Sequence, residues 1–430
     1  MFGTHRAKTH KIISLSANDT YYIATAVIRS LLGPISLFAV SHYLTTTERG
    51  YWYLLVTCTL IFNVADLGYS VAVTQVISKV TVGSVNKIRS KSGEIKFLVI
   101  NQLRRAGRTF AVSLFSMIIL LSITDRTKFL LLQPSPAILV LLGSSFQFIL
   151  TIVCANLEGS GLVIFSQRIK LVSAFSYTSI IAIGLANGLS LHTIGIALII
   201  SNAIAFGYFY VIFASLIGKI NRSESVKSSL QAEQVKLTKD YLVSFGSGFI
   251  IFNAFTPIAS YFSSIEFAGK VGMTTAVVMA IFGIAVSPIS SSLPAINSNF
   301  ATNRSDAYIL TRAAIQKGLI LFGISCCGLI TLLFIQSEQK LKLLHLTSAL
   351  STTAMILAMY FQIITNGNAT FIRASGRDPI RLISLYQAIA VLALTVIVCY
   401  LGSYDFIFMP LLFTNFVMFV VTYRKAREYE

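Results

Sequence analysis

The sequence predicts an all-α polytopic membrane protein of about twelve transmembrane helices, in two six-helix halves with both termini in the cytoplasm. Three observations support this prediction. Of the 430 residues, 55% are hydrophobic and only 12% are charged, about half the charged fraction of soluble domains. Apolar runs long enough to cross a bilayer recur along the whole chain, and basic residues gather in alternate connecting segments. Soluble enzyme classes are therefore excluded.

The apolar runs set the expected spans. In chain order they cover residues 21–43, 51–78, 109–123, 136–156, 171–190, 193–217, 241–263, 271–294, 318–335, 347–370, 382–401 and 405–422.

The basic residues orient these spans. With the N-terminus inside, 27 of the 34 Lys and Arg residues fall in cytoplasmic segments and 6 in outside loops, and the remaining one is Arg29 within the first span. A wrong number of spans would invert this alternation partway along the chain. The net charge of +18 therefore reflects orientation in a membrane, and no nucleic-acid partner is expected.

An internal repeat predicts where the chain divides. Residues 157–161 (LEGSG) and 372–376 (IRASG) lie 215 residues apart, and a looser pair, 48–50 and 266–269, lies at an offset of about 218. Such repeats are typical of transporters, although loops this short can also match by chance. We expect an N-terminal half over 1–217, a cytoplasmic linker over 218–240 and a C-terminal half over 241–430.

The second span carries a polar stripe at helical spacing, formed by Thr59, Asn63, Asp66, Ser70 and Thr74. Residues with these spacings share one helix face. Polar stripes within a bilayer face protein or a water-filled cavity, so this span is expected to line a cavity.

Arg29 lies inside the first span, where a charged side chain costs about 3 kcal/mol on insertion scales and normally has a partner or a cavity. Three roles fit: it binds an anionic substrate group, it forms an ion pair with Asp66, or it extends to the inner surface. Asp66 is the one acidic residue deep in a span. Either it couples transport to a proton or a sodium ion, or it is the partner of Arg29.

Span ten carries a second polar face made of Gln362, Asn366, Thr370 and Arg373, a further candidate lining for the cavity. Asn253 in span seven is a candidate substrate ligand, or an interhelical hydrogen-bonding residue. Four prolines, Pro34, Pro257, Pro288 and Pro294, interrupt apolar spans. They mark either flexible bends or static kinks.

Bond-making chemistry is not expected. The sequence has no phosphate-binding loop of the form GxxxxGK[ST] and no nucleophile elbow. The five cysteines all fall in apolar runs without metal-binding spacing. We therefore predict no enzyme activity, no cofactor and no metal.

Several of these residues match a known pattern. Glu48, Gly50 and the aromatic residues 51–53 open span two, residues 65–70 read ADLGYS, and residues 74–79 read TQVISK. Together with the Ser-Gly corners after spans four and ten, they resemble the O-antigen flippase branch of the multidrug/oligosaccharidyl-lipid/polysaccharide exporter superfamily.

The resemblance implies a function at the bacterial inner (cytoplasmic) membrane. It implies translocation of an undecaprenyl-diphosphate-linked oligosaccharide from the cytoplasmic to the periplasmic leaflet, by alternating access. A polysaccharide polymerase and a chain-length regulator are the implied partners. Arg29 would meet the diphosphate through charge-assisted hydrogen bonds.

Two other classes of protein fit the sequence less well. A drug or cation antiporter of the same superfamily would use Asp66 for coupling, but Arg29 would repel a cationic drug. A membrane glycan enzyme needs a large external loop, and no predicted outside loop exceeds about 15 residues.

Overall fold

The computed structural model describes residues 17–65, 70, 74, 134–159, 162–217, 238, 242–244, 246–338, 344–375 and 378–429. All regular elements in these residues are helical. They are α2 (Ala17–Tyr43), α3 (Thr46–Ala65), α8 (Ser135–Gly159), α9 (Val163–Ala186), α10 (His192–Ile217), the segment Leu242–Asn253, α12 (Phe255–Phe262), α13 (Ile265–Thr302), α14 (Arg304–Glu338), α15 (Ala349–Arg373), α16 (Arg381–Tyr400), the short 3-10 helix Tyr404–Phe406 and α17 (Met409–Tyr429).

Eight of the described helices are long and apolar enough to cross a membrane, or nine if Leu242–Asn253 and α12 form one bent span. The chain is therefore a multi-pass membrane protein. Each predicted span overlaps a helix except 109–123, which lies outside the described residues. The total of twelve spans, the cytoplasmic location of both termini and the division at residues 218–240 remain predictions.

Two helices are much longer than predicted. The expected spans 271–294 and 318–335 correspond to α13, with 38 residues, and α14, with 35 residues. The only break between them is Asn303, whose side chain accepts a hydrogen bond from the Ser305 backbone N–H at 3.1 Å and donates one to Asp306 at 3.0 Å. This is an N-cap, so polar residues between the two spans continue the helices instead of forming a loop.

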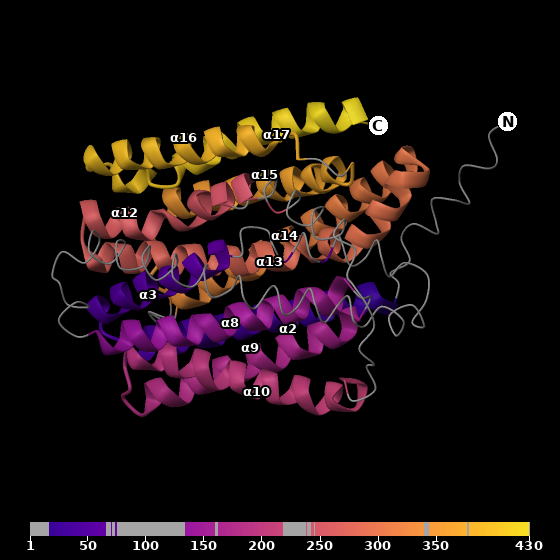
Figure 1. The fold of residues 1–430 in the computed structure, drawn as a ribbon. Helices are drawn as coiled ribbons and strands as arrows, with labels where there is room; N and C mark the ends of the chain where they lie inside the picture. Colours follow the sequence, from indigo (N-terminus) through magenta and orange to yellow (C-terminus); the bar gives the residue numbers. More distant parts are fainter. Residues whose placement is uncertain are drawn as a thin grey trace.

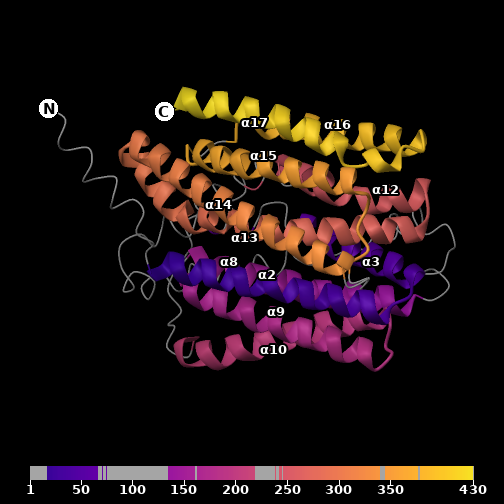
Figure 2. The ribbon, with the colours of Figure 1, turned by 180° about the vertical axis from the view of Figure 1, so that it is seen from behind.

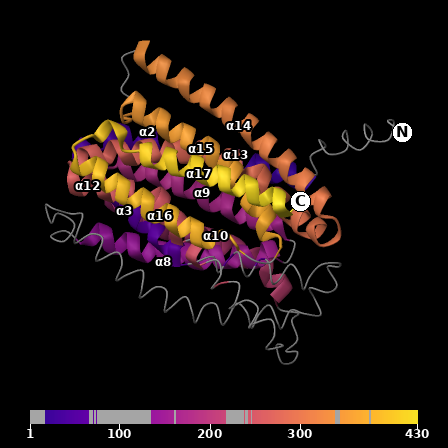
Figure 3. The ribbon, with the colours of Figure 1, turned by 90° about the horizontal axis from the view of Figure 1, so that it is seen from above.

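The helices form two groups that lie side by side (Figure 1). The N-terminal group contains α2, α3, α8, α9 and α10, and the C-terminal group contains α12 to α17 and the segment Leu242–Asn253. Helix α13 joins the groups because it packs on both α2 and α3, and Figure 2 shows α2 between α13 and α9. Helix α14 lies along one edge of the bundle (Figure 3). It exposes large apolar side chains such as Ile324 and Phe334, as a lipid-facing helix does.

Among the described residues, the two groups share one buried core. At the end that holds the α2–α3 and α12–α13 turns, one cluster of buried apolar residues includes Tyr53 and Leu55 from the N-terminal group and Phe255 and Val271 from the C-terminal group. At the opposite end the described residues form separate clusters. One lies around Phe371 within the C-terminal group, and another lies around Leu150, Cys154 and Ile169 within the N-terminal group. In the part of the chain that the structure describes, the groups are therefore packed together at the turn end and have separate cores at the end near the C-terminus.

Glycines bring the two groups into contact at the turn end. A Cβ atom on Gly50 of α3 would overlap the backbone carbonyl of Ile265 at the start of α13, and a Cβ on Gly269 would lie 3.2 Å from the Gly50 nitrogen. The hydroxyl of Thr47 also donates a hydrogen bond to Glu266 across the α3–α13 contact at 3.3 Å. The two segments that the sequence paired as a looser repeat, 48–50 and 266–269, thus lie against each other.

Both helices at this contact begin with side-chain caps. Thr45 and Glu48 form a capping box, in which the Glu48 carboxylate accepts from the Thr45 backbone N–H at 2.9 Å and the Thr45 hydroxyl accepts from the Glu48 N–H at 3.3 Å. Glu48 also accepts a hydrogen bond from Ser190 at 2.6 Å. At the start of α13, the hydroxyl of Ser264 accepts from the Phe267 N–H at 3.1 Å.

The prolines have different effects. The helix that contains Pro257 bends by 45° at Ala254, one turn before the proline, where the missing proline N–H leaves a carbonyl without its helical partner. Pro288, in contrast, lies within the continuous helix α13. There the Ser287 hydroxyl donates a hydrogen bond to the Ile284 carbonyl at 2.7 Å, which is the carbonyl that Pro288 cannot reach.

Candidate functional site: one polar cavity in each helix group

A cavity of about 370 Å³ lies inside the C-terminal group. Its volume is at the lower end of the range for ligand pockets. Amide and hydroxyl side chains face it together with the rings of Phe249 and Phe252. The polar lining includes Asn253, Gln362, Thr365, Asn366, Arg373 and Gln387.

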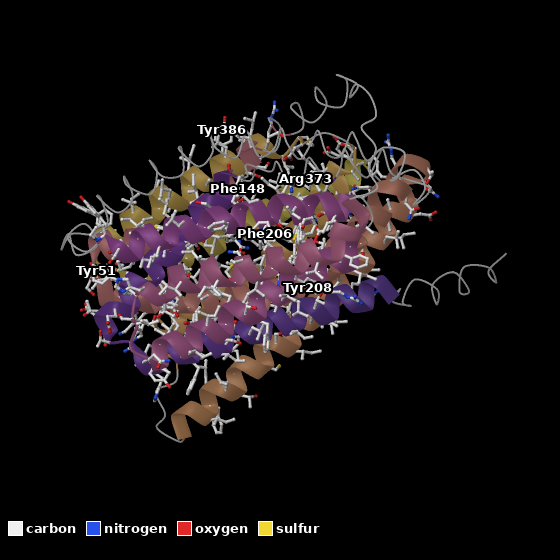
Figure 4. The ribbon with its side chains drawn as sticks, turned by 60° about the horizontal axis from the view of Figure 1, so that its bottom comes forward. Tyr51, Phe148, Phe206, Tyr208, Arg373 and Tyr386 are labelled. Atoms are coloured by element: carbon white, nitrogen blue, oxygen red, sulfur yellow. The ribbon has the colours of Figure 1, made fainter. Side chains whose placement is uncertain are left out.

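An ion pair sits at one end of this cavity. The guanidinium Nε of Arg373 lies 3.2 Å from a carboxylate oxygen of Asp378, which also accepts a hydrogen bond from the Ser244 hydroxyl at 2.6 Å. The Asp378 side chain is fully buried, whereas 25% of the Arg373 side chain is exposed. Figure 4 shows Arg373 well away from Tyr51, which lies near the turn end, and shows Tyr386 pointing out of the bundle. Arg373 therefore lines the cavity, whereas Asp378, the carboxylate that neutralises it, does not.

A second cavity, of about 360 Å³, lies inside the N-terminal group. Its lining also combines polar and apolar side chains, and Tyr177 is its aromatic residue. Two cations line it, and no carboxylate does so among the described residues. The polar lining includes Arg29, Thr59, Gln147, Thr151, Lys170 and Ser173.

The two cations of this cavity differ in their partners. The Lys170 ammonium lies 2.6 Å from a carboxylate oxygen of Glu158, which also accepts hydrogen bonds from Ser166 at 2.8 Å and Gln167 at 3.1 Å. Arg29 is exposed, and the structure gives it no ion pair with any residue that it describes. Asp66, its candidate partner, lies outside the described residues. The ion-pair interpretation therefore remains a prediction.

The offset of the internal repeat matches one helix wall of the N-terminal cavity with one wall of the C-terminal cavity. At the offset of 215 residues, positions on α8 that line the N-terminal cavity correspond to positions on α15 that line the C-terminal cavity. The matching pairs are Gln147 with Gln362, Leu150 with Thr365, Thr151 with Asn366, and Cys154 with Ala369. The same offset pairs Glu158 with Arg373, the α8 and α15 members of the two ion pairs.

The turns between helices give a second, independent alignment of the two helix groups, which we call a register. Helices α2 and α3 meet at residues 43–46, and α12 and α13 meet at residues 262–265, an offset of 219. This register places Arg29 opposite Gly248, and both residues line their respective cavities. The two registers thus match one helix wall, and Arg29 with Gly248, between the two cavities.

The predicted site residues do not form a single group. Asn253, Gln362, Asn366 and Arg373 line the C-terminal cavity, whereas Arg29 lines the N-terminal one. Of the stripe on span two, Thr59 also lines the N-terminal cavity. Ser70 is half-buried in a helical position, and the Thr74 hydroxyl donates a hydrogen bond to the Ala155 carbonyl of α8 at 3.1 Å. Asn63 lies on α3, but its side chain, like the whole of Asp66, is outside the described part of the chain.

Sequence reasoning missed Gln147, Thr151, Lys170 and Asp378. The first two could have been found by applying the offset of 215 to Gln362 and Asn366. Lys170 could have been found as a basic residue within two turns of the Ser-Gly corner. Asp378 lies in a connecting segment just before α16, and no local pattern marks it.

Comparison with solved structures identifies the fold. The chain resembles an inward-facing multidrug resistance MATE family transporter of the MOP superfamily with a TM-score of 0.63 and 14% identity, over 97% of this chain and 95% of the other. A MATE protein in a straight conformation matches with a TM-score of 0.65 and 11% identity, over 95% and 94% of the two chains. The MATE multidrug transporter DinF-BH in complex with R6G matches with a TM-score of 0.61 and 13% identity, over 95% and 94%.

No protein-family model matches the sequence. No curated protein sequence matches it either. The chain therefore has the all-helical fold of MATE transporters along nearly its whole length, and at this level of identity the likeness defines the fold alone.

Proposed function

We propose that the chain is a transporter of the cytoplasmic membrane that moves an anionic, lipid-linked saccharide from one leaflet to the other. One observation carries the proposal: Arg29 faces a polar cavity and has no ion pair with any described residue. A cation in the apolar part of a membrane normally has a partner or a ligand. A diphosphate is a suitable ligand because guanidinium groups bind phosphate oxygens with two parallel hydrogen bonds.

The form of the substrate follows from the rest of the site. Amide and hydroxyl groups replace the water that surrounds a sugar, while the isoprenoid tail stays in lipid. An undecaprenyl-diphosphate-linked oligosaccharide, which the sequence resemblance implies, has these three parts. A polysaccharide polymerase and a chain-length regulator remain the proposed partners.

The arrangement of the helix groups supports alternating access. The groups share a core at the turn end and have separate cores at the other end. With the N-terminus inside, as the basic residues predict, the separated ends face the cytoplasm, where the lipid-linked precursor is made. Rocking of the two groups would then open the opposite side.

A second candidate is favoured by the comparisons. The solved structures that resemble the chain are titled as multidrug transporters, which supports a drug antiporter, the alternative reading of the sequence, better than it supports the flippase. The charges of the N-terminal cavity favour the flippase, because Lys170 is paired with Glu158 and the remaining cation, Arg29, would repel a cationic drug. In an antiporter, Asp66 would bind the coupling ion.

A deletion strain separates the two functions. If the chain is the flippase, surface polysaccharide is lost and single undecaprenyl-linked repeat units accumulate, and Arg29→Gln fails to restore the polymer although Arg29→Lys restores part of it. Arg424→Gln, which removes an exposed arginine outside both cavities, should restore it fully. Normal polymer together with new sensitivity to cationic drugs would instead establish the antiporter.

A further inference from the structure

The two cavities have equivalent positions but different net charges. The N-terminal cavity has two cations, Arg29 and Lys170, and one neutralising carboxylate, Glu158. The C-terminal cavity has one cation, Arg373, which is neutralised by Asp378. Among the described residues, the first site therefore carries a net charge of about +1 and the second is close to neutral.

The difference arises at repeat-equivalent positions. Arg29 on α2 corresponds to Gly248, so the duplicated architecture has a guanidinium in one cavity and no side chain in the other. At two matched positions of α8 and α15, the more polar side chain is the one in the C-terminal cavity. Leu150 corresponds to Thr365, and Thr151 corresponds to Asn366, so over these two positions the C-terminal wall gains one amide.

The polar groups of the C-terminal cavity are available for a neutral ligand. The amide of Gln362 donates a hydrogen bond to the side-chain oxygen of Asn366 at 3.0 Å, which holds two amides in a fixed orientation on one helix face. Asn253 and Gln387 line the same cavity, so four amide side chains in all face it. Amide groups both donate and accept hydrogen bonds, as the hydroxyl groups of a neutral ligand require.

The aromatic residues fit the same kind of ligand. Phe249 and Phe252 line the cavity, and the ring of Phe252 lies 6.4 Å from that of Phe282 on α13. Sites for small molecules combine apolar and aromatic walls with a few oriented polar groups. A sugar ring has an apolar C–H face and a rim of hydroxyl groups, and it matches both features without carrying charge.

The two cavities flank one helix contact. A Cβ on Gly33 of α2 would lie 3.9 Å from the side chain of Ala280 on α13. Arg29, one turn from Gly33, faces the N-terminal cavity, and Met279, beside Ala280, faces the C-terminal cavity. Packed helices lie about 8–10 Å apart, so a head group that occupies both sites has to span a distance of about this size.

From these observations we infer that the two halves divide the substrate: the N-terminal cavity holds the anionic diphosphate and the C-terminal cavity holds a neutral sugar next to it. The C-terminal cavity is therefore a sugar-binding subsite, in which Gln362 and Asn366 determine specificity. This inference depends on the proposed function, because it divides the substrate of that function between the two sites.

The repeat supplies a matched pair of variants. Purified full-length protein would be titrated with undecaprenyl diphosphate and, separately, with the same lipid carrying one N-acetylglucosamine. We expect the wild type to bind the sugar-bearing lipid about tenfold more tightly. Gln362→Leu should bring this ratio close to one without weakening binding of the bare lipid, whereas the repeat-equivalent Gln147→Leu should keep the ratio. Arg29→Gln should weaken both lipids at least tenfold and keep the ratio.

The outcomes distinguish failure of the sugar subsite from failure of the proposed function. If the bare lipid binds in an Arg29-dependent way but the sugar adds no affinity, the sugar subsite is refuted and the proposed function stands. The subsite is also refuted if both glutamine variants lower the ratio equally. If neither lipid binds the wild type, the proposed function and the subsite fail together. Asn366→Thr, which installs the residue of the equivalent N-terminal position, should lower the ratio without changing the thermal stability of the free protein, and therefore controls for misfolding.

Discussion

Substitution of Gly50 by alanine should push the two helix groups apart at the turn end. The added Cβ would overlap the backbone carbonyl of Ile265, and a backbone atom cannot move aside by changing a rotamer. Overpacking of this kind costs about 1–3 kcal/mol. That cost falls only on the arrangement in which α3 and α13 are in contact, so the population of this arrangement should drop by about 5- to 150-fold relative to one in which they are separated.

Disulfide cross-linking between α3 and α13 measures this change in population. The Thr47 hydroxyl and the Glu266 carboxylate lie 3.3 Å apart, so cysteines at these two positions should form a disulfide readily when the helices touch. The five native cysteines would first be replaced by alanine. In this background Gly50→Ala should slow oxidative cross-linking at least fivefold, and it should lower transport because the protein can no longer close the turn end.

The matched control is Gly323→Ala on α14, where an added Cβ meets no atom within 4 Å. It should leave cross-linking and transport unchanged. If Gly50→Ala cross-links at the wild-type rate, the glycine contact does not control the closed arrangement and the reasoning is wrong. Equal slowing by both substitutions would also refute it, because the effect would then not come from the α3–α13 contact.

Three further predictions concern stability. Asp378→Asn should lower the unfolding free energy by about 3 kcal/mol, because it leaves Arg373 without its counter-charge, and the double variant with Arg373→Gln should recover part of the loss in thermal unfolding. Burial raises the pKa of Glu48, but its side-chain and backbone hydrogen bonds outweigh this effect, so the pKa is lowered overall. The resulting stabilisation is present above the unfolded pKa of about 4.3 and is lost as the pH falls through the lower folded value, so Glu48→Gln should flatten the dependence of the melting temperature on pH between about 5 and 3. Finally, Gly195→Ala should destabilise the α8–α10 contact by about 1–3 kcal/mol, since its Cβ would overlap Leu139, whereas Gly207→Ala meets no atom within 4 Å and should be neutral.

The features that the sequence predicted well are local ones. Apolar runs mark membrane helices because a segment must be long and apolar to cross the bilayer, and the described helices overlap the predicted spans. The polar face of α15 was predicted from helical spacing, and the structure places Gln362, Asn366 and Arg373 along one cavity. Its fourth member, Thr370, is not in the lining, and its hydroxyl donates a hydrogen bond to the Asn366 carbonyl at 2.8 Å. Both predictions depend only on residues within one helix.

The features that it predicted poorly depend on packing between helices. Spacing along one helix does not show which other helices enclose a cavity. The sequence therefore predicted one cavity lined by Arg29 and by residues of α15, whereas the structure has two cavities. Asp378 neutralises Arg373 from a connecting segment, and its position follows from the path of the chain after α15. The bend at Ala254 lies three residues before Pro257, since a proline frees a carbonyl in the preceding turn.

Arg29 carries the difference in net charge between the two cavities, and its position also matters for the proposed rocking of the two helix groups. It lies one turn from the Gly33–Ala280 contact, where α2 of one group meets α13 of the other. A rocking motion pivots where two bodies stay in contact, so side chains next to that contact move least while the ends of the helices move most. An anion held by Arg29 would therefore stay near mid-depth as access changes from one side to the other. The charged part of the substrate would keep its counter-ion throughout, and the neutral sugars would need only hydrogen-bonding groups along the way.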